Sequence, residues 1–566
     1  MAATGRQVAR RGGILSPLRV PMFRAVWAAN LVGSIGWLVQ GVGAAWLMTT
    51  LAGTADMVAL VQTATMAPIL LFALFAGALA DLWDRRWVLL LAQVWVAAAA
   101  FGLALTSFYG LLTPAALLLF TFLIGTGAAL NGPAWQAVVR ELVPADELAG
   151  AVTLNAIGFN LARAVGPAVG GAVVAGFGTE AAFLLNGITA LALVLVLLAW
   201  RRQLPKDDLP RERLMSAVVT GLRYVGETAT LRAILTRATV FGVAAAAGLA
   251  LLPLVARDRL GGGPIVYGLL LGAFGVGALA GAFVVHPLRQ RRGAEFVVTA
   301  LAAAGGLAFV AMGLFSSLVL PVVLALALAG TAWLGSFSTF NITVQMRTAF
   351  WVQARVLSLY QTVVFGGMAI GAWGWGAFAE RTSLESAYLL AGAVLLGSLA
   401  LHWLLPVSGG EAPDLQPATR QEPLPTIQAA AEEGPVMVQI EYEVGAANAP
   451  AFIRAMDEVG HLRRRNGAVR WRLFQDVADG VRWTEVFVLG DWVEPRRLRR
   501  RMTMADAALE ARAVAYHRGK DAPVRRYMVA RRHDARFALS EAEQAELAAS
   551  READAVRAEV TDSRPV

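Results

Sequence analysis

The chain has 566 residues, of which 57% are apolar and only 16% charged, and its formal net charge is +9. Soluble domains usually contain about 25% charged residues, so this composition indicates a membrane protein. The chain has no cysteine, which excludes disulfides, thiolate nucleophiles and cysteine-ligated metals. Its histidines are scattered and its basic surplus comes without a recognition motif, so we expect no metal, no cofactor and no nucleic-acid partner.

Long apolar runs follow one another up to residue 406, and no later run could cross a bilayer. A spanning helix needs about 20 mainly apolar residues. In chain order, the predicted spans are 23–50, 58–80, 87–107, 114–138, 149–174, 181–200, 233–256, 264–287, 296–316, 320–345, 355–379 and 385–405. The pattern predicts an all-α membrane domain of twelve helices.

These spans divide into two six-helix halves with polar segments around them. The predicted order is a basic N-terminus over 1–22, an N-terminal half over 23–200, a central loop over 201–232 and a C-terminal half over 233–406. A weak likeness between the segments that follow the fourth and tenth spans suggests that the halves are repeats. Repeated halves with the substrate site between them are the usual plan of secondary transporters.

Lys and Arg are distributed unevenly over the connections between these spans. Most lie in the N-terminal segment, the central loop and the even-numbered connections, whereas the odd-numbered ones contain Arg257, Arg259 and Arg381. Positively charged connections stay in the cytoplasm. We therefore expect a multi-pass protein of the bacterial inner (plasma) membrane, with both termini cytoplasmic and no cleavable signal.

The predicted cytoplasmic end of the second span carries a basic motif. Residues 77–86 read Gly-Ala-Leu-Ala-Asp-Leu-Trp-Asp-Arg-Arg, which resembles the loop signature of the major facilitator superfamily. The resemblance implies that Gly77 permits close helix approach and that Asp81 pairs with a helix start in the other half, where a carboxylate is favoured. It also implies that Arg85 or Arg86 helps to close the cytoplasmic side.

This motif departs from the family signature at two positions. The family prefers Arg where this chain has Leu82, and Gly where it has Asp84. The alternative interpretation is therefore an ordinary basic loop that takes no part in gating.

The fifth predicted span contains a second motif, Gly-Pro-Ala-Val-Gly-Gly over 166–171. Small residues at this spacing let helices pack backbone to backbone, and Pro167 removes a helix hydrogen bond. The core Gly166, Pro167, Gly170 and Gly171 resembles the span-five signature of major facilitator exporters, which implies export. Tight packing without any directional meaning is the alternative, because the upstream glycines of that signature are absent.

Arg163 lies near the middle of the same span. A cation there costs at least about 2.5–3.5 kcal/mol, so we expect it to face a cavity or a partner, with Asn160 one turn earlier. The predicted spans contain no Asp or Glu well inside them. We therefore expect a neutral or anionic substrate with Arg163 as its counter-charge. The alternative is that Arg163 braces the bent helix by bonding carbonyls.

Two features bear on energy coupling. Thr121 stands where many superfamily members have an Arg in the fourth span, so that signature is missing. With no carboxylate deep in a span, a hypothesis of proton coupling rests on Asp81 or on a site that the sequence does not identify.

Polar residues at helical spacing complete the predicted cavity. Asn30 and Trp37 share one face of the first span with Ser34 and Gly41. The other candidates lie on the second, fourth, fifth, tenth and eleventh spans: Gln62, Asn131, Trp135, Asn155, Asn341, Gln345 and Gln361. Each amide has an alternative role, since amides in membranes often bond only neighbouring helices.

The last part of the chain has the composition of a soluble domain. Residues 407–434 read as a linker and 532–566 as a charged tail. Between them the pattern predicts strands over 436–444, 469–475, 481–489 and 524–529, and helices over 449–465 and 494–517. This strand–helix–strand–strand–helix–strand order is ferredoxin-like and predicts an α+β domain over 435–531.

Across both domains the chain resembles the transmembrane secretion effector branch of the major facilitator superfamily. The matching motifs are Asn-Leu-Ala-Arg-x-x-Gly-Pro over 160–167, Val-Met-Val-x-x-Glu-Tyr over 436–442, Arg-Trp-x-Leu-Phe-x-Asp over 470–476 and Met-Thr-x-Ala-Asp over 502–506. That branch includes the enterobactin exporter and is close to macrolide efflux proteins. The resemblance implies a secondary exporter of a siderophore- or macrolide-like molecule.

The soluble domain resembles small dimeric α+β barrels of the antibiotic-monooxygenase kind. Fold alone does not give function, and we find no convincing catalytic group, so we expect no enzyme activity and favour dimerisation or regulation. The sequence contains no Gly-x-x-x-x-Gly-Lys-Ser/Thr loop, which argues against an ATP-driven pump. The competing interpretation of the whole chain is a membrane-anchored sensor or enzyme that acts through this domain.

Overall fold

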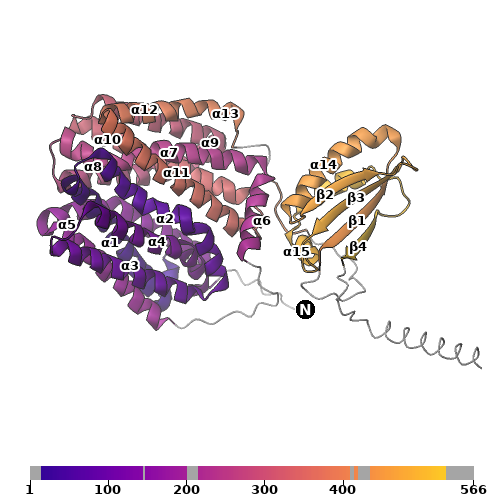
Figure 1. Cartoon of the computed structure of the whole chain (residues 1–566), viewed down its shortest axis with the longest axis horizontal. Coiled ribbons are helices and arrows are strands. Elements are labelled where there is room, and N and C mark those ends of the chain that lie inside the picture. The colour runs from indigo at the N-terminus through magenta and orange to yellow at the C-terminus, as the bar shows by residue number, and fades with distance from the viewer. Residues whose placement is uncertain (1–14, 145–146, 201–213, 408–412, 419–433, 531–566) are drawn as a thin grey trace, which may run out of the picture. The chain divides into compact units, whose positions relative to one another are not determined.

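The computed structural model describes residues 15–144, 147–200, 214–407, 413–418 and 434–530. The chain divides into two compact units, one formed by 1–348 and 352–412 and the other by 349–351 and 413–566. We call them the helical unit and the sheet unit (Figure 1). The basic N-terminus before residue 15, the first part of the central loop and the predicted charged tail lie outside the described residues.

The first half of the helical unit follows the predicted order. In its described residues the helices are α1 (Pro21–Leu51), α2 (Ala55–Leu82), α3 (Arg85–Phe108), α4 (Pro114–Leu142) and α5 (Leu148–Ala199). N-cap residues determine where two of these helices begin. Asp84 caps α3 by accepting from the Arg86 N–H, and Thr113 caps α4 by accepting from the Ala116 N–H.

A short amphipathic helix, α6 (Leu214–Gly226), precedes the second half. The helices that follow it are α7 (Ala229–Ala250), α8 (Leu252–Leu254), α9 (Pro264–Leu314), α10 (Val319–Met346), α11 (Gln353–Arg381), α12 (Leu384–Gly397) and α13 (Leu401–Leu404). A π-helical turn, η2 (Val255–Arg259), joins α8 to the loop before α9.

Ten helical segments within the described residues are long and apolar enough to cross a membrane. Two of the predicted pairs of spans lie within single labelled segments, α5 and α9, each of which contains a kink. A straight 52-residue helix would be about 78 Å long, far more than a bilayer's hydrocarbon core of about 30 Å. Both are interrupted by a glycine at positive φ, Gly178 (φ 85°) and Gly293 (φ 81°), a conformation that side-chain-bearing residues rarely adopt.

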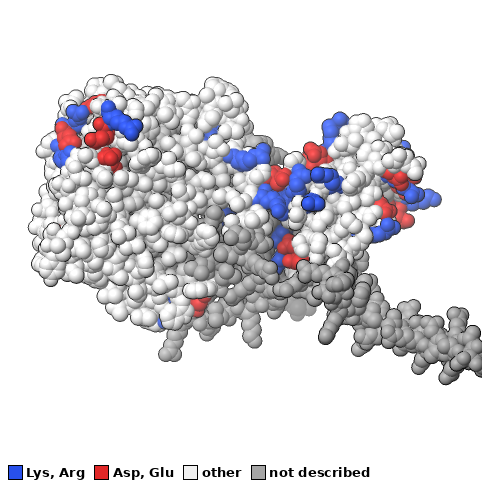
Figure 2. Space-filling model, in the orientation of Figure 1, with Lys and Arg blue, Asp and Glu red and all other residues white. Residues whose placement is uncertain are grey.

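The surface of the helical unit is largely apolar. Figure 2 shows a broad face of this unit almost free of charged residues, with acidic and basic groups gathered at its upper left. Large apolar side chains such as Phe177 (78% exposed) and Phe283 (75% exposed) project from this unit. Exposed apolar surface on this scale fits contact with lipid rather than water.

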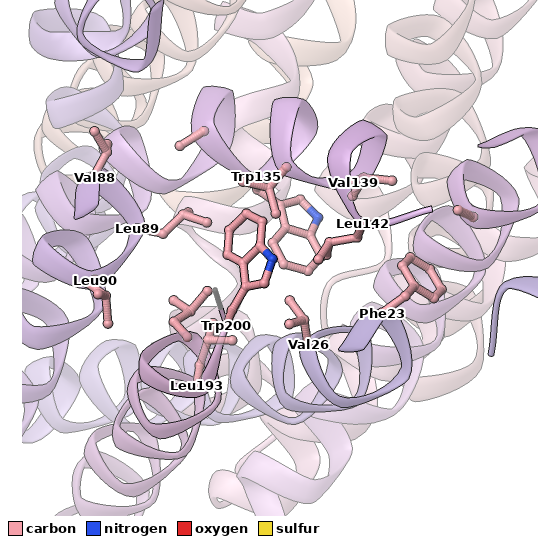
Figure 3. Packing of buried hydrophobic residues seen from close by; sticks show 14 of the residues in the cluster. Phe23, Val26, Val88, Leu89, Leu90, Trp135, Val139, Leu142, Leu193 and Trp200 are labelled. Atoms are coloured by element: carbon pink, nitrogen blue, oxygen red, sulfur yellow. The ribbon is translucent and has the colours of Figure 1, made fainter. Parts of the chain in front are cut away.

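One end of the N-terminal half contains a compact apolar cluster. It joins Phe23 at the start of α1, Val88 at the start of α3, Leu142 at the end of α4 and Trp200 after α5. Figure 3 shows the indole rings of Trp135 and Trp200 among these residues. This packing joins the ends of α1, α3, α4 and α5.

The two halves meet along two helix pairs. α5 packs on α9 so closely that a Cβ atom on Gly171 would lie 2.7 Å from the Pro264 carbonyl oxygen and 3.0 Å from the Gly268 Cα. On the other side α2 packs on α11, where Ser358 Oγ donates to the Ala73 carbonyl at 2.9 Å. The cavity described below lies between these two seams.

The sheet unit has four antiparallel strands in the order β2-β3-β1-β4. Its elements are β1 (Val436–Glu443), α14 (Ala449–Arg465), β2 (Arg470–Gln475), β3 (Arg482–Leu489), α15 (Glu494–Arg501), α16 (Met504–Val514) and β4 (Val524–Val529). Each predicted strand is present within two residues of its expected bounds. The core gathers Phe452 and Met456 of α14 against Trp483 and Phe487 of β3.

The predicted helix over 494–517 is wrong in its continuity. Two helices replace it, because Thr503 adopts an extended backbone and forms a capping box with Asp506 that starts α16. The predicted linker also contains an ordered part: the Met504 N–H donates to the Gln416 carbonyl and the Ala418 N–H donates to the Met502 carbonyl. Residues 413–418 therefore belong to the sheet unit.

Candidate functional site

A cavity of about 600 Å³ lies between the two halves of the helical unit. The N-terminal half contributes α1, α2, α3, α4 and α5 to its wall, and the C-terminal half contributes residues such as Tyr267, Trp333 and Gln361. Pockets that bind small molecules commonly have volumes of about 300–1,000 Å³ and mostly apolar walls with a few polar groups. The size and lining therefore suit a small organic molecule.

Arg163 is the one charged side chain among the described residues that line this cavity. Its guanidinium carbon lies 4.7 Å from the ring centroid of Phe159 on α5 and 4.4 Å from that of Trp333 on α10. Within the described part of the chain, these ring contacts are its only specific interactions. The proposed bracing of the helix by bonds from Arg163 to carbonyls has no support among those residues.

The predicted cavity residues divide into two groups. Ten of the thirteen line the cavity, namely Asn30, Ser34, Trp37, Gly41, Gln62, Asn131, Trp135, Asn155, Arg163 and Gln361. Asn160, Asn341 and Gln345 do not belong to the described lining. On α5, Phe159 rather than Asn160 lines the cavity, one full turn before Arg163. The Asn341 side chain accepts a hydrogen bond from Gln345 Nε2 at 2.6 Å.

Several lining amides are already committed to neighbours. Gln93 Nε2 donates to Asn131 Oδ1 at 3.0 Å, and Trp135 Nε1 donates to Asn155 Oδ1 at 3.1 Å. Such bonds tie α3 to α4 and α4 to α5, as the alternative interpretation of these amides expected. By contrast, the structure describes no side-chain hydrogen bond for Asn30, Gln62 or Gln361, which leaves them available to a ligand.

Sequence reasoning missed the aromatic part of the wall. Phe159, Tyr267, Phe274 and Trp333 line the cavity, yet aromatic residues are common in apolar spans and carry no distinguishing pattern there. Phe159 could have been found, because it precedes Arg163 by four residues and positions four apart share a helix face. Trp333 comes from the other half, and nothing local in the sequence connects it to Arg163.

The basic motif after α2 makes its described contacts within the N-terminal half. Arg85 pairs with Glu141 at the end of α4 at 2.6 Å, and Arg86 donates to the Leu197 and Leu198 carbonyls at the end of α5. Asp84, which replaces the family's Gly, serves as the cap of α3. Gly77 and Asp81 fall in the last turns of α2, and their side chains lie outside the described residues.

The glycines of the span-five motif contact different helices. Gly166 packs against Leu38 and Gly170 against Val39, both on α1, whereas Gly171 packs against α9. Pro167 lines the cavity and has no N–H to donate to the carbonyl of residue 163. The motif thus packs α5 against its own half and against the other half, shortly after Arg163 in the sequence.

At the opposite end of α2, two charged side chains of the C-terminal half contact the loop between α1 and α2. Arg257 donates to the carbonyls of Thr49 and, at 3.3 Å, Gly53, and Glu380 accepts from the Ala55 N–H at 2.6 Å. Cations are favoured at helix C-termini and anions at N-termini. The two side chains therefore complement the end of α1 and the start of α2, and they join the halves there.

Solved structures share this fold at low sequence identity. A POT family transporter in complex with 5-aminolevulinic acid matches with a TM-score of 0.58 and 14% identity, covering 70% of this chain and 97% of that one. A bacterial homologue of the human lysosomal transporter Spinster matches with a TM-score of 0.52 and 16% identity, covering 69% and 95%. These likenesses establish the transporter fold alone.

Two curated relatives are more similar in sequence. The multidrug efflux pump Tap of Mycobacterium tuberculosis is 26% identical over 386 residues, which cover 66% of this chain and 90% of Tap. The enterobactin exporter EntS of Escherichia coli is 28% identical over 399 residues, which cover 66% and 91%. The family model described as transmembrane secretion effector matches residues 12–534, across both units. The chain belongs to the transmembrane secretion effector family of the major facilitator superfamily, a family of multi-pass membrane transporters with small-molecule exporters among its members.

Proposed function

We propose that the chain is a secondary transporter that exports a neutral or anionic small molecule through twelve membrane passes. Ten apolar segments are described, and two of them are about twice as long as one pass requires. A break at Gly178 in α5 and at Gly293 in α9 divides each into two passes, which gives the twelve of the proposal.

The distribution of basic residues supports one orientation in the bacterial inner membrane. Arg85 and Arg86 mark the end of α2 that we assign to the cytoplasm, because basic connections stay on that side. The loop between α1 and α2 is then on the outer side. Both chain termini and the central loop are cytoplasmic in this arrangement.

Alternating access provides the transport mechanism in this proposal. At the outer end, Arg257 and Glu380 of the C-terminal half bond the α1–α2 loop of the N-terminal half. Nearer the inner end, Ser358 of α11 bonds the Ala73 carbonyl of α2 across the halves. Release of cargo outward requires the charged bonds at the outer end to break, and we propose that they open and close during transport.

The cargo class follows from one observation, the unpaired Arg163 in a cavity whose described lining contains no Asp or Glu. A buried cation without a carboxylate favours an anionic or acceptor-rich ligand and disfavours a cationic one. A siderophore- or macrolide-like molecule is the proposed cargo, with Asn30, Gln62 and Gln361 among its polar contacts.

The motif over 77–86 is the proposed cytoplasmic gate. Its arginines organise the ends of α4 and α5, and Asp81 is the residue through which we propose contact with the other half. Asp81 is also the proposed site of proton coupling, because the described cavity lining lacks a carboxylate that could carry a proton.

Inverted membrane vesicles test the proposed function. We expect energised vesicles that contain the chain to accumulate fluorescein, an anionic xanthene dye, and to exclude rhodamine 123, its cationic counterpart of similar shape. Arg163→Gln should abolish the accumulation of fluorescein, and nigericin should do so by dissipating the pH gradient. Arg257→Gln combined with Glu380→Gln should slow it, because the outer closure is weakened.

Accumulation of rhodamine 123 alone would contradict the charge argument. Transport that survives nigericin would contradict proton coupling without affecting the cargo class. A chain ended after residue 410 completes the test: if its transport persists, the exporter proposal stands, and if all function is lost from a well-inserted protein, the sensor or enzyme alternative is favoured.

For the sheet unit we propose a ferredoxin-like domain that mediates dimerisation. β2 is an edge strand, and Phe474 on it is 54% exposed while the nearby Val469 is 55% exposed. Apolar side chains on an unpaired edge favour association with another chain. Light scattering on the purified protein should give the mass of a dimer, and Phe474→Glu should give the mass of a monomer; a monomeric wild-type protein contradicts the proposal.

A further inference from the structure

The cavity contains a contact between the halves that the exporter proposal does not use. Arg163 of α5 belongs to the N-terminal half, and its guanidinium lies over the ring of Trp333 from α10 in the C-terminal half. Its second ring contact, Phe159, comes from its own helix. One aromatic ring from each half therefore contacts the same cation.

Such contacts fix the guanidinium without consuming its hydrogen bonds. Stacking on aromatic faces uses the π surface of the group, whereas its five N–H donors lie in the guanidinium plane. The structure describes no acceptor for these donors. The two ring contacts thus orient the Arg163 guanidinium and leave its N–H donors available to a ligand.

Trp333 is itself held by aromatic neighbours. Its ring makes edge contacts with Phe274 at 5.9 Å and with Phe337 at 5.1 Å, both within the C-terminal half. Its Nε1 is buried and has no hydrogen-bond partner among the described residues. The ring is therefore anchored through packing to the C-terminal half, and what it offers Arg163 is its face rather than its N–H.

We propose that Phe159 and Trp333 are positioning residues that hold the Arg163 guanidinium for an oxyanion of the cargo. Because Trp333 belongs to the other half, the cavity binds such an anion tightly only when α5 and α10 are drawn together. Recognition of the cargo and approach of the two halves then become one event. This inference rests on the proposed export function and names the residues that couple binding to movement.

The chemistry of the cargo follows from this arrangement. A carboxylate or similar oxyanion accepts two parallel hydrogen bonds from a guanidinium. The surrounding Trp333, Phe159 and Phe274 favour a planar aromatic body attached to that group. An aromatic carboxylate or a comparable aromatic anion is the ligand class that this site fits.

Binding of fluorescein to the purified full chain, followed by fluorescence anisotropy, tests the positioning role. A cation–π contact in a desolvated site changes affinity by about 2- to 30-fold. Trp333→Ala should weaken fluorescein binding within that range, and Trp333→Phe, which keeps a ring without the N–H, should restore most of it. Phe309→Leu is the matched control, because Phe309 is a buried aromatic residue of the same half that packs on Tyr388 and does not belong to the described cavity lining.

Rhodamine 123 separates charge recognition from general damage. Trp333→Ala should leave its weak binding unchanged. Equal losses for both dyes, or a loss in Trp333→Phe as large as in Trp333→Ala, would overturn the inference. If the wild-type protein binds no fluorescein, the proposal that the chain exports anions is contradicted. If Trp333→Ala binds fluorescein normally while Arg163→Gln does not, only the positioning role of Trp333 is contradicted.

Movement is tested by spin-label distances. The chain has no native cysteine, so labels attach only at introduced positions such as Leu161 on α5 and Leu328 on α10, which are 49% and 40% exposed. Because the Arg163–Trp333 contact is already present without a ligand, fluorescein should narrow the distance distribution around the short distance in wild type and Trp333→Phe but not in Trp333→Ala. A distribution that responds equally in all three contradicts the coupling of binding to movement.

Discussion

Two arginines, one in each unit, solve the problem of a charge inside the protein in different ways. Arg463 of α14 is 2% exposed in the sheet unit and is surrounded by carboxylates. Arg163 of α5 lies in the cavity of the helical unit against aromatic rings. Arg463 has its hydrogen-bond acceptors within the protein, whereas the described residues provide none for Arg163. The difference separates a structural charge from one that is available to a ligand.

The hydrogen bonds around Arg463 form a network of side chains of the sheet unit. Arg463 Nε lies 2.9 Å from Glu485 Oε1, and its Nη1 bonds Glu510 of α16. Glu485 also accepts from Tyr442 Oη and Trp471 Nε1, each at 3.1 Å. Burial and then the neighbouring Glu485 carboxylate raise the pKa of Tyr442, which keeps its hydroxyl a donor.

Electrostatics keep this cation charged. Burial alone would lower the pKa of Arg463, but Glu485 and Glu510 outweigh burial and raise it well above its ordinary value. The carboxylates that bind Arg463 are those of Glu485 and Glu510, so its acceptors come from the protein itself. Arg163 has no such compensation in the described residues, which is why we assign it to cargo.

The largest expected effect comes from breaking the closed network. Arg463→Met leaves Glu485 and Glu510 buried without their cation, which should cost the sheet unit about 3–5 kcal/mol. Hydrogen exchange on the full chain should show loss of protection over 436–529 with the helical unit unchanged. Arg512→Met is the control, because Arg512 and Glu458 are 64% and 56% exposed and such a pair contributes at most about 1 kcal/mol.

An all-apolar replacement sharpens the same point. Arg463→Met together with Glu485→Leu and Glu510→Leu removes every charge of the trio, and such replacements are often neutral or stabilising. Protection should then return toward the wild-type level. Continued loss in the triple variant would show that packing, rather than an unpaired charge, explains the single variant.

A third arginine gives the intermediate case. Arg237 of α7 is 5% exposed and pairs with Glu295 of α9, which also accepts from His402 Nδ1 at 2.9 Å and from the Val407 N–H at 2.5 Å. Arg237→Met leaves Glu295 with its other donors. We therefore expect a smaller loss of about 1.5–3 kcal/mol in the helical unit.

Thermal unfolding of the purified protein measures this loss, with Arg259→Met as control. Arg259 pairs with Glu385 at the bundle surface, where the two side chains are 35% and 30% exposed. If the melting temperature falls equally in the two variants, burial does not determine the strength of these pairs.

The sequence predicted the arrangement of elements better than the contacts between them. Apolar run length predicted the spans, because the bilayer imposes one length on each pass. The predicted spans 149–174 and 181–200, and likewise 264–287 and 296–316, lie on either side of Gly178 and Gly293, where the backbone leaves the helical conformation within α5 and α9, although nothing marked these two glycines among the chain's 56. The break before α16 was readable, because Thr503 and Asp506 have the spacing of a capping box.

For the site, charge in an apolar context was the informative signal. Arg163 was found because a cation in mid-span needs an explanation. Arg237 was overlooked near a span end, and the Arg463 network was overlooked although Glu485 lies in phase with Trp483 and Phe487 on β3. Trp333 could not be predicted, because its role depends on how the two halves pack.

The smallest expected effect on stability is that of Arg163 itself. Arg163→Gln removes ring contacts worth about 0.5–2 kcal/mol but also removes the cost of a buried charge without acceptors. The melting temperature of the purified protein should therefore stay the same or rise. Added fluorescein should raise it in wild type, since a ligand stabilises the state that binds it, but not in the variant. A fall as large as that of Arg237→Met would mean that Arg163 supports the fold as Arg463 does, and the contrast between the two arginines would then be lost.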